Sequence, residues 1–134
     1  MLDEQQIDRL VSYAFAARGN AYAPYSGFAV GAAVLMDSGE IFTGCNIENA
    51  SFGLTICAER TAIAKAVSSG ERKIAAISVA SAGGATPCGA CRQVISEFAA
   101  PDAVVIVLDV DRDDGERVFS AAQLLPESFE FDRR

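Results

Sequence analysis

The chain has 134 residues, a length typical of one domain, with 51% hydrophobic residues, 22% charged residues and a net charge of −7. Proteins that bind nucleic acid polymers need a basic surface, and here the 11 Lys and Arg residues are scattered along an acidic chain. No apolar run approaches the roughly 20 residues of a membrane span. We therefore expect no nucleic acid polymer and no membrane as partner, and a small uncharged ligand fits better.

The sequence contains four cysteines and no histidine. The opening residues 1–4 are acidic, without the basic flank and apolar core of a secretory signal, so we expect reduced thiols and a cytoplasmic protein. Because imidazole is absent, any metal must be held by cysteines and carboxylates, and any proton shuttle must be another group.

Hydrophobic spacing and turn residues predict alternating helices and strands. The first helix begins at the N-cap Asp3, with Gln6 at the capping-box position, and stops at Gly19-Asn20. The following elements are, in chain order, a strand over 27–36, its hairpin partner over 40–44, a polar loop over 45–56, a helix over 57–69, a strand over 73–80, a helix over 88–99, a strand over 103–108, an edge strand over 116–119, a short helix over 120–125 and a loose tail.

This order predicts an α/β fold, a three-layer sandwich in which residues 1–134 form a single domain around a sheet flanked by helices. The leading hairpin is antiparallel, whereas the later strand–helix–strand connections need parallel crossovers, so the sheet should be mixed. The nearly continuous apolar run over 103–108 is typical of a strand that is covered on both faces.

Three cysteines fall at predicted helix starts. Thr55 can cap one helix and place Cys57 in its first turn. In the other helix Thr86 can be the cap, followed by Pro87, and Cys88 and Cys91 then lie three residues apart on one face. Helix N-termini of consecutive units in an α/β sheet can meet beyond the strand ends, where such folds place their sites.

Three thiolates would leave one of the four tetrahedral positions of a zinc ion free, as in a catalytic zinc site. Soft sulfur ligands favour zinc, one ion per chain. Glu59 lies two residues from Cys57, close enough to act on a metal-bound water without being a ligand. Arg60 and Arg92 can donate hydrogen bonds to the sulfurs and partly neutralise their charge.

Less specific interpretations of these residues exist. The cysteines could be buried thiols without a metal, or Cys45 could be a fourth ligand that closes a purely structural zinc site used for binding. Glu59 could be a favourable acidic residue in a first helical turn. Arg60 and Arg92 could be ordinary surface residues.

The metal motif and several flanking segments together resemble the small zinc-dependent cytidine deaminases of the homotetrameric type. The resemblance covers the chain from about Tyr22 to Phe129. The segments that carry it are CAERTA at 57–62, PCGACRQV at 87–94, NIENA at 46–50, PYSGFAVG at 24–31 and LLPESF at 124–129.

This resemblance implies a mixed five-stranded sheet and a zinc-dependent hydrolysis of free cytidine and 2′-deoxycytidine to uridine and 2′-deoxyuridine plus ammonia, in pyrimidine salvage. It implies Glu59 as the catalytic proton carrier and a homotetramer. The substrate contacts that it implies are Phe28 against the pyrimidine, Asn46 and Glu48 on the sugar hydroxyls, Ala58, and Phe129 reaching the site of a neighbouring subunit.

Alternatives for the substrate residues stay open at this point. Asn46 and Glu48 could form a turn, and Phe28 could belong to the core. Related deaminases act on nucleoside antibiotics such as blasticidin or on bases within nucleic acid. The Asn46-x-Glu48 pair argues for a free nucleoside with exposed hydroxyls, and the acidic charge argues against a polymer.

Overall fold

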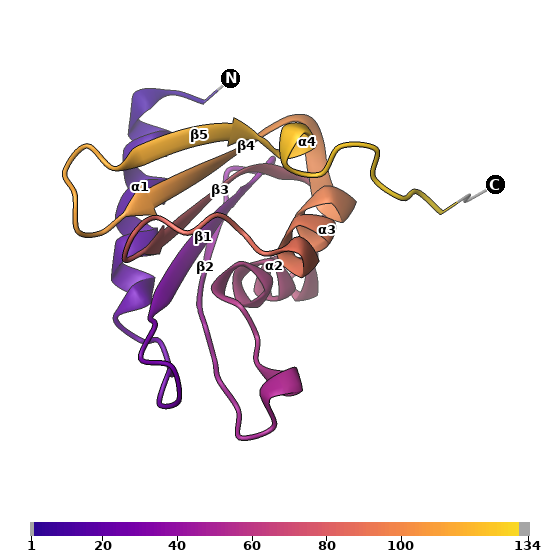
Figure 1. Ribbon diagram of the computed structural model, residues 1–134. Helices are drawn as coiled ribbons and strands as arrows, with labels where there is room; N and C mark the ends of the chain where they lie inside the picture. The colour runs from indigo at the N-terminus through magenta and orange to yellow at the C-terminus, as the bar shows by residue number, and fades with distance from the viewer. Residues whose placement is uncertain (1, 132–134) are drawn as a thin grey trace.

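The computed structural model describes residues 2–131, which form a five-stranded sheet between helices (Figure 1). Met1 and residues 132–134, the two ends of the predicted domain and of its loose tail, lie outside the described residues. The elements are α1 (Glu4–Arg18), β1 (Val30–Met36), β2 (Ile41–Cys45), a short 3-10 helix η1 (Phe52–Leu54), α2 (Ala58–Ser68), β3 (Ile74–Ser81), α3 (Gly89–Phe98), β4 (Ala99–Asp109), β5 (Glu116–Ser120) and α4 (Ala121–Leu124).

The strand order is β2-β1-β3-β4-β5. Strand β1 is antiparallel to both β2 and β3, β3 and β4 are parallel, and β4 and β5 are antiparallel. The helix α3 makes the crossover between the parallel neighbours β3 and β4, as a parallel pair requires. The predicted mixed sheet and the α/β class are therefore confirmed.

The two faces of the sheet carry separate apolar cores, because successive side chains of a strand point to opposite sides. In β1, Ala33 and Leu35 pack beside Leu10 and Ala14 of α1, whereas Val34 faces the helices of the other side. The second core joins the sheet to α2, α3 and α4 through Ala58, Ala62, Ile63, Ala66, Ile95 and Ala121. One helix thus covers one face and three cover the other, which gives the three layers (Figure 1).

Glycine allows α2 to lie close against the sheet. A Cβ atom at Gly44 of β2 would lie 2.5 Å from the backbone nitrogen of Ala62 and 2.6 Å from the carbonyl oxygen of Ala58. No side chain fits at that separation, so Gly44 fixes the distance between β2 and the first turns of α2.

Two helix starts differ from the prediction. Helix α2 begins at Ala58 with Cys57 as N-cap, not Thr55, because Ile56 is held extended by a pair of 2.9 Å backbone hydrogen bonds with Ile47. Helix α3 begins at Gly89 with Cys88 as N-cap, not Thr86. Both cysteines therefore stand at the boundary of a helix rather than inside its first turn.

The first strand is shorter than predicted and begins at Val30 rather than at residue 27. The side chain of Asn46 accepts a hydrogen bond from the Val30 N–H and donates one to the Phe28 carbonyl, so a side chain replaces the strand ladder there. Strand β4, in contrast, begins at Ala99, earlier than the predicted residue 103, since Ala99 already pairs with Ile74.

Candidate metal centre and active site

The sulfurs of the two N-cap cysteines lie beside each other, 4.0 Å apart between Cys57 and Cys88. Cys91, one turn into α3, is fully buried, and its backbone N–H points at the Cys88 sulfur at 3.5 Å. The three sulfurs all lie within 4.8 Å of one another. The structure thus brings the three predicted ligands together from two helices that are far apart in sequence.

This donor set fits a zinc ion. With Zn–S bonds of about 2.3 Å, tetrahedral geometry separates two sulfurs by about 3.8 Å, close to the observed Cys57–Cys88 distance. Cys45 is not in the cluster, and its thiol donates to the Asn20 carbonyl instead. Three sulfurs without a fourth match a zinc site that keeps one open position.

The electrostatics of the cluster favour thiolate. A hydrogen bond from the Cys91 thiol lowers the pKa of Cys57 to about 5, burial opposes this, and the nearby Arg60 guanidinium adds to the lowering. The same hydrogen bond and burial raise the pKa of Cys91. The N-termini of α2 and α3 add positive partial charge at the two N-cap sulfurs. One negative charge is therefore already stable among these sulfurs, and a cation would draw out the remaining protons.

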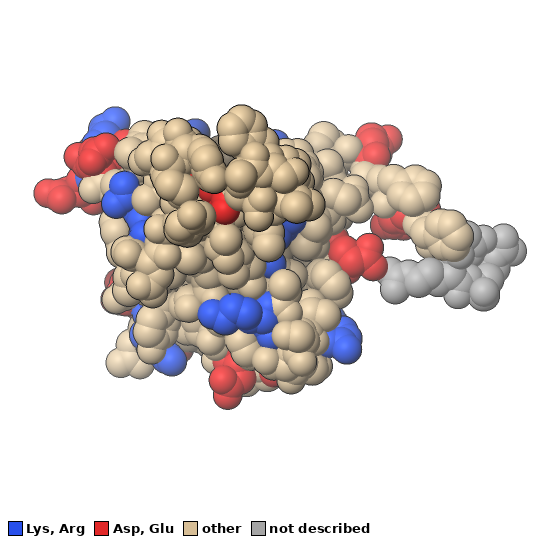
Figure 2. Space-filling view, turned by 90° about the horizontal axis from the view of Figure 1, so that it is seen from below, with Lys and Arg blue, Asp and Glu red and all other residues tan. Residues whose placement is uncertain are grey.

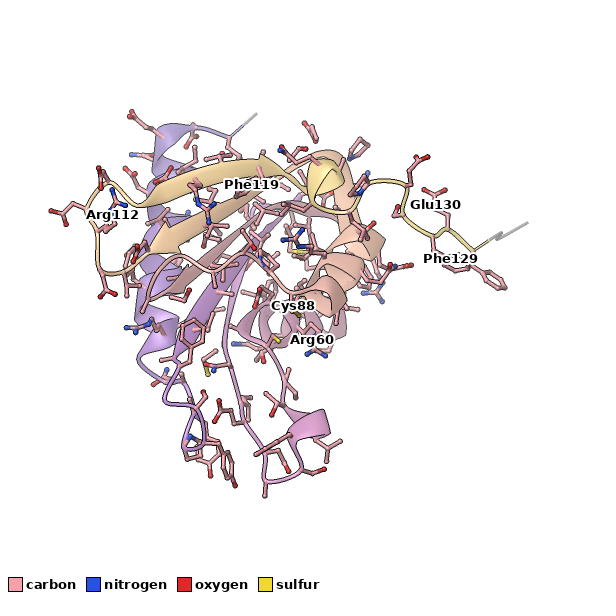
Figure 3. All side chains as sticks on the ribbon, in the orientation of Figure 1. Arg60, Cys88, Arg112, Phe119, Phe129 and Glu130 are labelled. Atoms are coloured by element: carbon pink, nitrogen blue, oxygen red, sulfur yellow. The ribbon has the colours of Figure 1, made fainter. Side chains whose placement is uncertain are left out.

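Arg60 is the guanidinium that contacts the cluster. Its Nη2 donates to the Cys57 sulfur at 3.4 Å, and Figure 3 shows it in the same region as Cys88. Arg92, the other predicted neutralising residue, points elsewhere. Its three hydrogen bonds go to the Pro87 carbonyl, the Thr86 hydroxyl and the Leu124 carbonyl. Three of its five N–H groups thus donate to oxygens, and among the described residues Arg92 is bonded to these oxygens rather than to a sulfur.

Glu59 lies in the first turn of α2, two residues beyond Cys57, and is only 5% exposed. Burial raises the pKa of Glu59 to about 7, the Cys57 charge adds to this, and Arg60 acts against it. A carboxyl with a pKa near neutrality exchanges protons readily at that pH, although a bound cation would lower the value.

Asn46 is buried, and its side-chain amide bonds the backbone on either side of Ala29, as described for the start of β1. Both ends of that amide hold the segment that carries Phe28, whose ring is 40% exposed. The structure therefore places Asn46 beneath Phe28, and each amide end keeps capacity for one more hydrogen bond.

Glu48 lines a shallow surface pocket of about 320 Å³. Its carboxylate accepts hydrogen bonds from the backbone N–H groups of Tyr25 and Ser26 and from the Ser26 hydroxyl. The Ser26 hydroxyl is the main cause of the lowered pKa of Glu48, which burial partly opposes. Glu48 therefore remains a carboxylate that joins the loop before β1 to the loop after β2.

The sequence analysis predicted no binding role for the other residues that line this pocket. Tyr25 and Phe52 pack edge to face with ring centroids 5.7 Å apart, and Ser26 and Thr55 complete the lining. The signal that could have indicated Tyr25 and Phe52 is that both are aromatic residues in otherwise polar loops that contain glycine. An aromatic ring outside a strand or helix is often exposed for binding.

Ala58 and Phe129 have opposite environments. Ala58 is fully buried at the start of α2 against the sheet. Phe129 is 74% exposed on the extended segment after α4, and Figure 3 shows it pointing away from the body that holds Cys88. Within one chain, Phe129 therefore lies far from the cysteine cluster.

The part of the chain that the structure describes contains no helix that is both long and apolar enough to cross a bilayer.

Comparisons with known proteins agree with the geometry. Residues 4–108 match the family model described as the cytidine and deoxycytidylate deaminase zinc-binding region. A cytidine deaminase of Sporosarcina psychrophila is 46% identical over 125 residues, covering 92% of this chain and 90% of the relative. A cytidine deaminase of Halalkalibacterium halodurans is 48% identical over 122 residues, covering 90% of this chain and 91% of the relative.

Solved structures show the same likeness. The crystal structure of cytidine deaminase from Burkholderia pseudomallei superimposes with a TM-score of 0.86 at 45% identity, covering 96% of this chain and all of that one. Cytidine deaminase from Mycobacterium leprae gives a TM-score of 0.77 at 37% identity, covering 90% of this chain and 98% of that one. The sulfur cluster lies within the matched zinc-binding region, and the chain therefore belongs to the cytidine and deoxycytidylate deaminase family.

Proposed function

We propose that this protein hydrolyses free cytidine and 2′-deoxycytidine to uridine and 2′-deoxyuridine with release of ammonia, and that it serves pyrimidine salvage. The observation that carries this proposal is the cluster of Cys57, Cys88 and Cys91 with buried Glu59 on the first turn beside it. The related cytidine deaminases, which align over most of the chain, support the substrate class.

Cys57, Cys88 and Cys91 would hold the zinc, which would supply the activation of water for attack on the ring carbon. The chain itself supplies the proton transfers. Glu59 is buried, carries a raised pKa and is placed by the same helix start that places Cys57. Its carboxyl carries two protons in turn, the first from the attacking water to the ring nitrogen and the second from the hydroxyl newly bound to the ring carbon to the leaving amine. Arg60 holds the Cys57 sulfur as a thiolate ligand.

The remaining predicted contacts supply recognition. We assign Glu48 and Asn46 to the sugar hydroxyls, with Phe28 against the pyrimidine and the buried Ala58 at the base of the site. The open pocket beside Glu48 and the exposed ring of Phe28 support this assignment. A small pocket of this kind fits a free nucleoside rather than a base within a polymer, for which the net charge of −7 is also unfavourable.

We also propose that the working form is a homotetramer in the cytoplasm. Seven large apolar side chains are exposed on two adjacent segments, over 22–28 and 47–56. They are Tyr22, Tyr25, Phe28, Ile47, Phe52, Leu54 and Ile56. Figure 2, seen from below, shows a face on which uncharged residues predominate, interrupted by basic and acidic side chains. Such a patch is unusual for a monomer, and the exposed ring of Phe129 on its extended segment supports a contact with another subunit. Four free thiols, three of them needed as ligands, fit a reducing compartment.

The test measures the loss of cytidine absorbance and the zinc content of the same sample. We expect turnover with one zinc per chain. Glu59→Ala should keep the zinc and lower kcat by about 100-fold to 10,000-fold, the range of general acid–base catalysis. Normal turnover in that variant would refute the proton-transfer role.

Substrate choice and assembly need two further measurements. Rates on cytidine, deoxycytidine, blasticidin S and a short single-stranded DNA should be high for the first two only. Light scattering should give the mass of four chains, and a monomer mass would contradict the tetramer.

A further inference from the structure

Arg92 connects two segments that are distant in sequence. Its Nε donates to the Pro87 carbonyl at 2.7 Å and its Nη2 to the Thr86 hydroxyl at 3.1 Å, both in the turn that leads into Cys88. Its Nη1 donates to the Leu124 carbonyl at 3.1 Å, at the end of α4. One guanidinium thus joins the metal-ligand turn to the last residue of the C-terminal helix.

The segment that follows Leu124 carries Phe129. Helix α4 is only four residues long, too short to be stable by itself, so its position depends on tertiary contacts. Beyond it Pro126 restricts the backbone, and Glu127 bends the chain with a φ of 52°. The direction in which residues 125–131 leave the body is therefore set where Arg92 holds the Leu124 carbonyl.

Only an arginine satisfies all three acceptors. The guanidinium presents its N–H groups in a rigid planar fork and remains charged at any accessible pH. A lysine ammonium at the same position could reach one or two of these oxygens but not hold all three in one plane. The half-buried side chain leaves little room for water to replace the lost contacts.

We propose that Arg92 is a positioning residue that fixes the C-terminal segment 125–131 to the metal-ligand turn, and so delivers Phe129 in the correct place for substrate binding in a neighbouring subunit. The inference rests on the proposed function in assigning a substrate contact to Phe129. In this proposal Arg92 positions the backbone, while Arg60 donates the hydrogen bond that partly neutralises the thiolates.

The test compares Arg92→Gln with Arg72→Gln, a matched control. Arg72 also donates to two backbone carbonyls, those of Val67 and Glu71 at 2.8 Å each, but lies in the loop between α2 and β3. For each variant we would measure zinc content, kcat, KM for cytidine, and hydrogen–deuterium exchange of residues 121–131 by mass spectrometry. Arg92→Lys and Phe129→Ala complete the set, with the Arg92→Gln/Phe129→Ala double variant.

Arg92→Gln should keep one zinc per chain, raise KM about tenfold with a smaller change in kcat, and speed exchange in 121–131, because charged hydrogen bonds contribute roughly that factor each. The KM and the exchange rate of Arg92→Lys should lie between those of Arg92→Gln and the wild type. Those of Arg72→Gln should match the wild type. In the Phe129→Ala background, Arg92→Gln should raise KM no further, since both act through the same ring.

Loss of zinc, or unchanged exchange in 121–131, would overturn the proposal and show that Arg92 acts on the metal turn alone. A KM effect that multiplies with that of Phe129→Ala would also overturn it. Should Phe129→Ala by itself leave KM unchanged, the substrate role of Phe129 is wrong. The exchange measurement then still decides whether Arg92 anchors the segment.

Discussion

The metal centre and the loop surface beside it are built in different ways. The cysteines and Glu59 stand at the starts of α2 and α3, which pack on the sheet through a continuous buried core, and Glu59 and Cys91 are almost inaccessible to solvent. The pocket beside Glu48, in contrast, is formed by loops whose aromatic rings are exposed, with Phe52 at 73%.

This difference separates chemistry from recognition. One chain by itself places every group that the proposed proton transfer needs, because rigid helices hold them. The proposed recognition surface is open on one side, and its apolar rings are exposed to solvent. Changes in the first region should therefore abolish activity, and changes in the second should modify it.

The largest effect is expected for the ligands. Cys91→Ala removes a buried sulfur from the cluster, so the protein should lose its zinc and all measurable turnover. Cys45→Ala removes a thiol that bonds only the Asn20 carbonyl and should retain one zinc per chain and nearly full activity. Metal analysis of both variants checks this, and zinc loss in Cys45→Ala would instead support a closed structural site.

A smaller effect, on the free energy of unfolding, is expected when one glycine of each region is replaced by alanine. In Gly44→Ala the new Cβ would meet backbone atoms of α2 at 2.5 and 2.6 Å, so the free energy of unfolding should fall by about 3 kcal/mol. Gly53→Ala, in the loop, meets nothing within 4 Å and should change it by less than about 0.5 kcal/mol. Urea denaturation measures the free energy of unfolding of both variants. Equal losses in the two variants would contradict the contrast between a packed centre and an open loop.

The smallest effect concerns the loop anchor at Glu48. Because its pKa is lowered in the folded protein, Glu48 contributes stability that is present above the ordinary glutamate pKa and is lost as the pH falls through the folded value. Ser26→Ala removes the largest cause and should raise the pKa of Glu48 toward its ordinary value. NMR titration of the carboxyl carbon measures the pKa of Glu48 in both proteins. An unchanged pKa in Ser26→Ala would contradict the role of the Ser26 hydroxyl in anchoring Glu48.

Much of the fold follows from local patterns. The capping box at Asp3 and Gln6 formed as predicted, and the order of a hairpin followed by a strand–helix–strand connection correctly predicted the mixed sheet. The helix starts at Cys57 and Cys88 could not be predicted to the residue. The start of α2 depends on a bridge between Ile47 and Ile56, which is a tertiary contact.

The candidate site shows the same limit. Cysteine spacing predicted which sulfurs meet, since helix starts in successive units converge. Arg92 follows Cys91 directly in sequence, but this proximity does not reveal that its nitrogens donate to carbonyl and hydroxyl oxygens of residues 86, 87 and 124, and its neutralising role stays a prediction. Hydrogen-bond partners of a long side chain are set by the fold, not by adjacency.

The distance along the chain between the ligands has a consequence for folding. Cys57 and Cys88 are 31 positions apart, and the intervening segment contains α2 and β3. A metal that binds both sulfurs acts as a covalent-like cross-link around that loop, and closing a loop of this length is worth about 3–4 kcal/mol of unfolded-state entropy. An ion held by these cysteines would therefore also stabilise the fold by linking the starts of α2 and α3, which pack on the same face of the sheet.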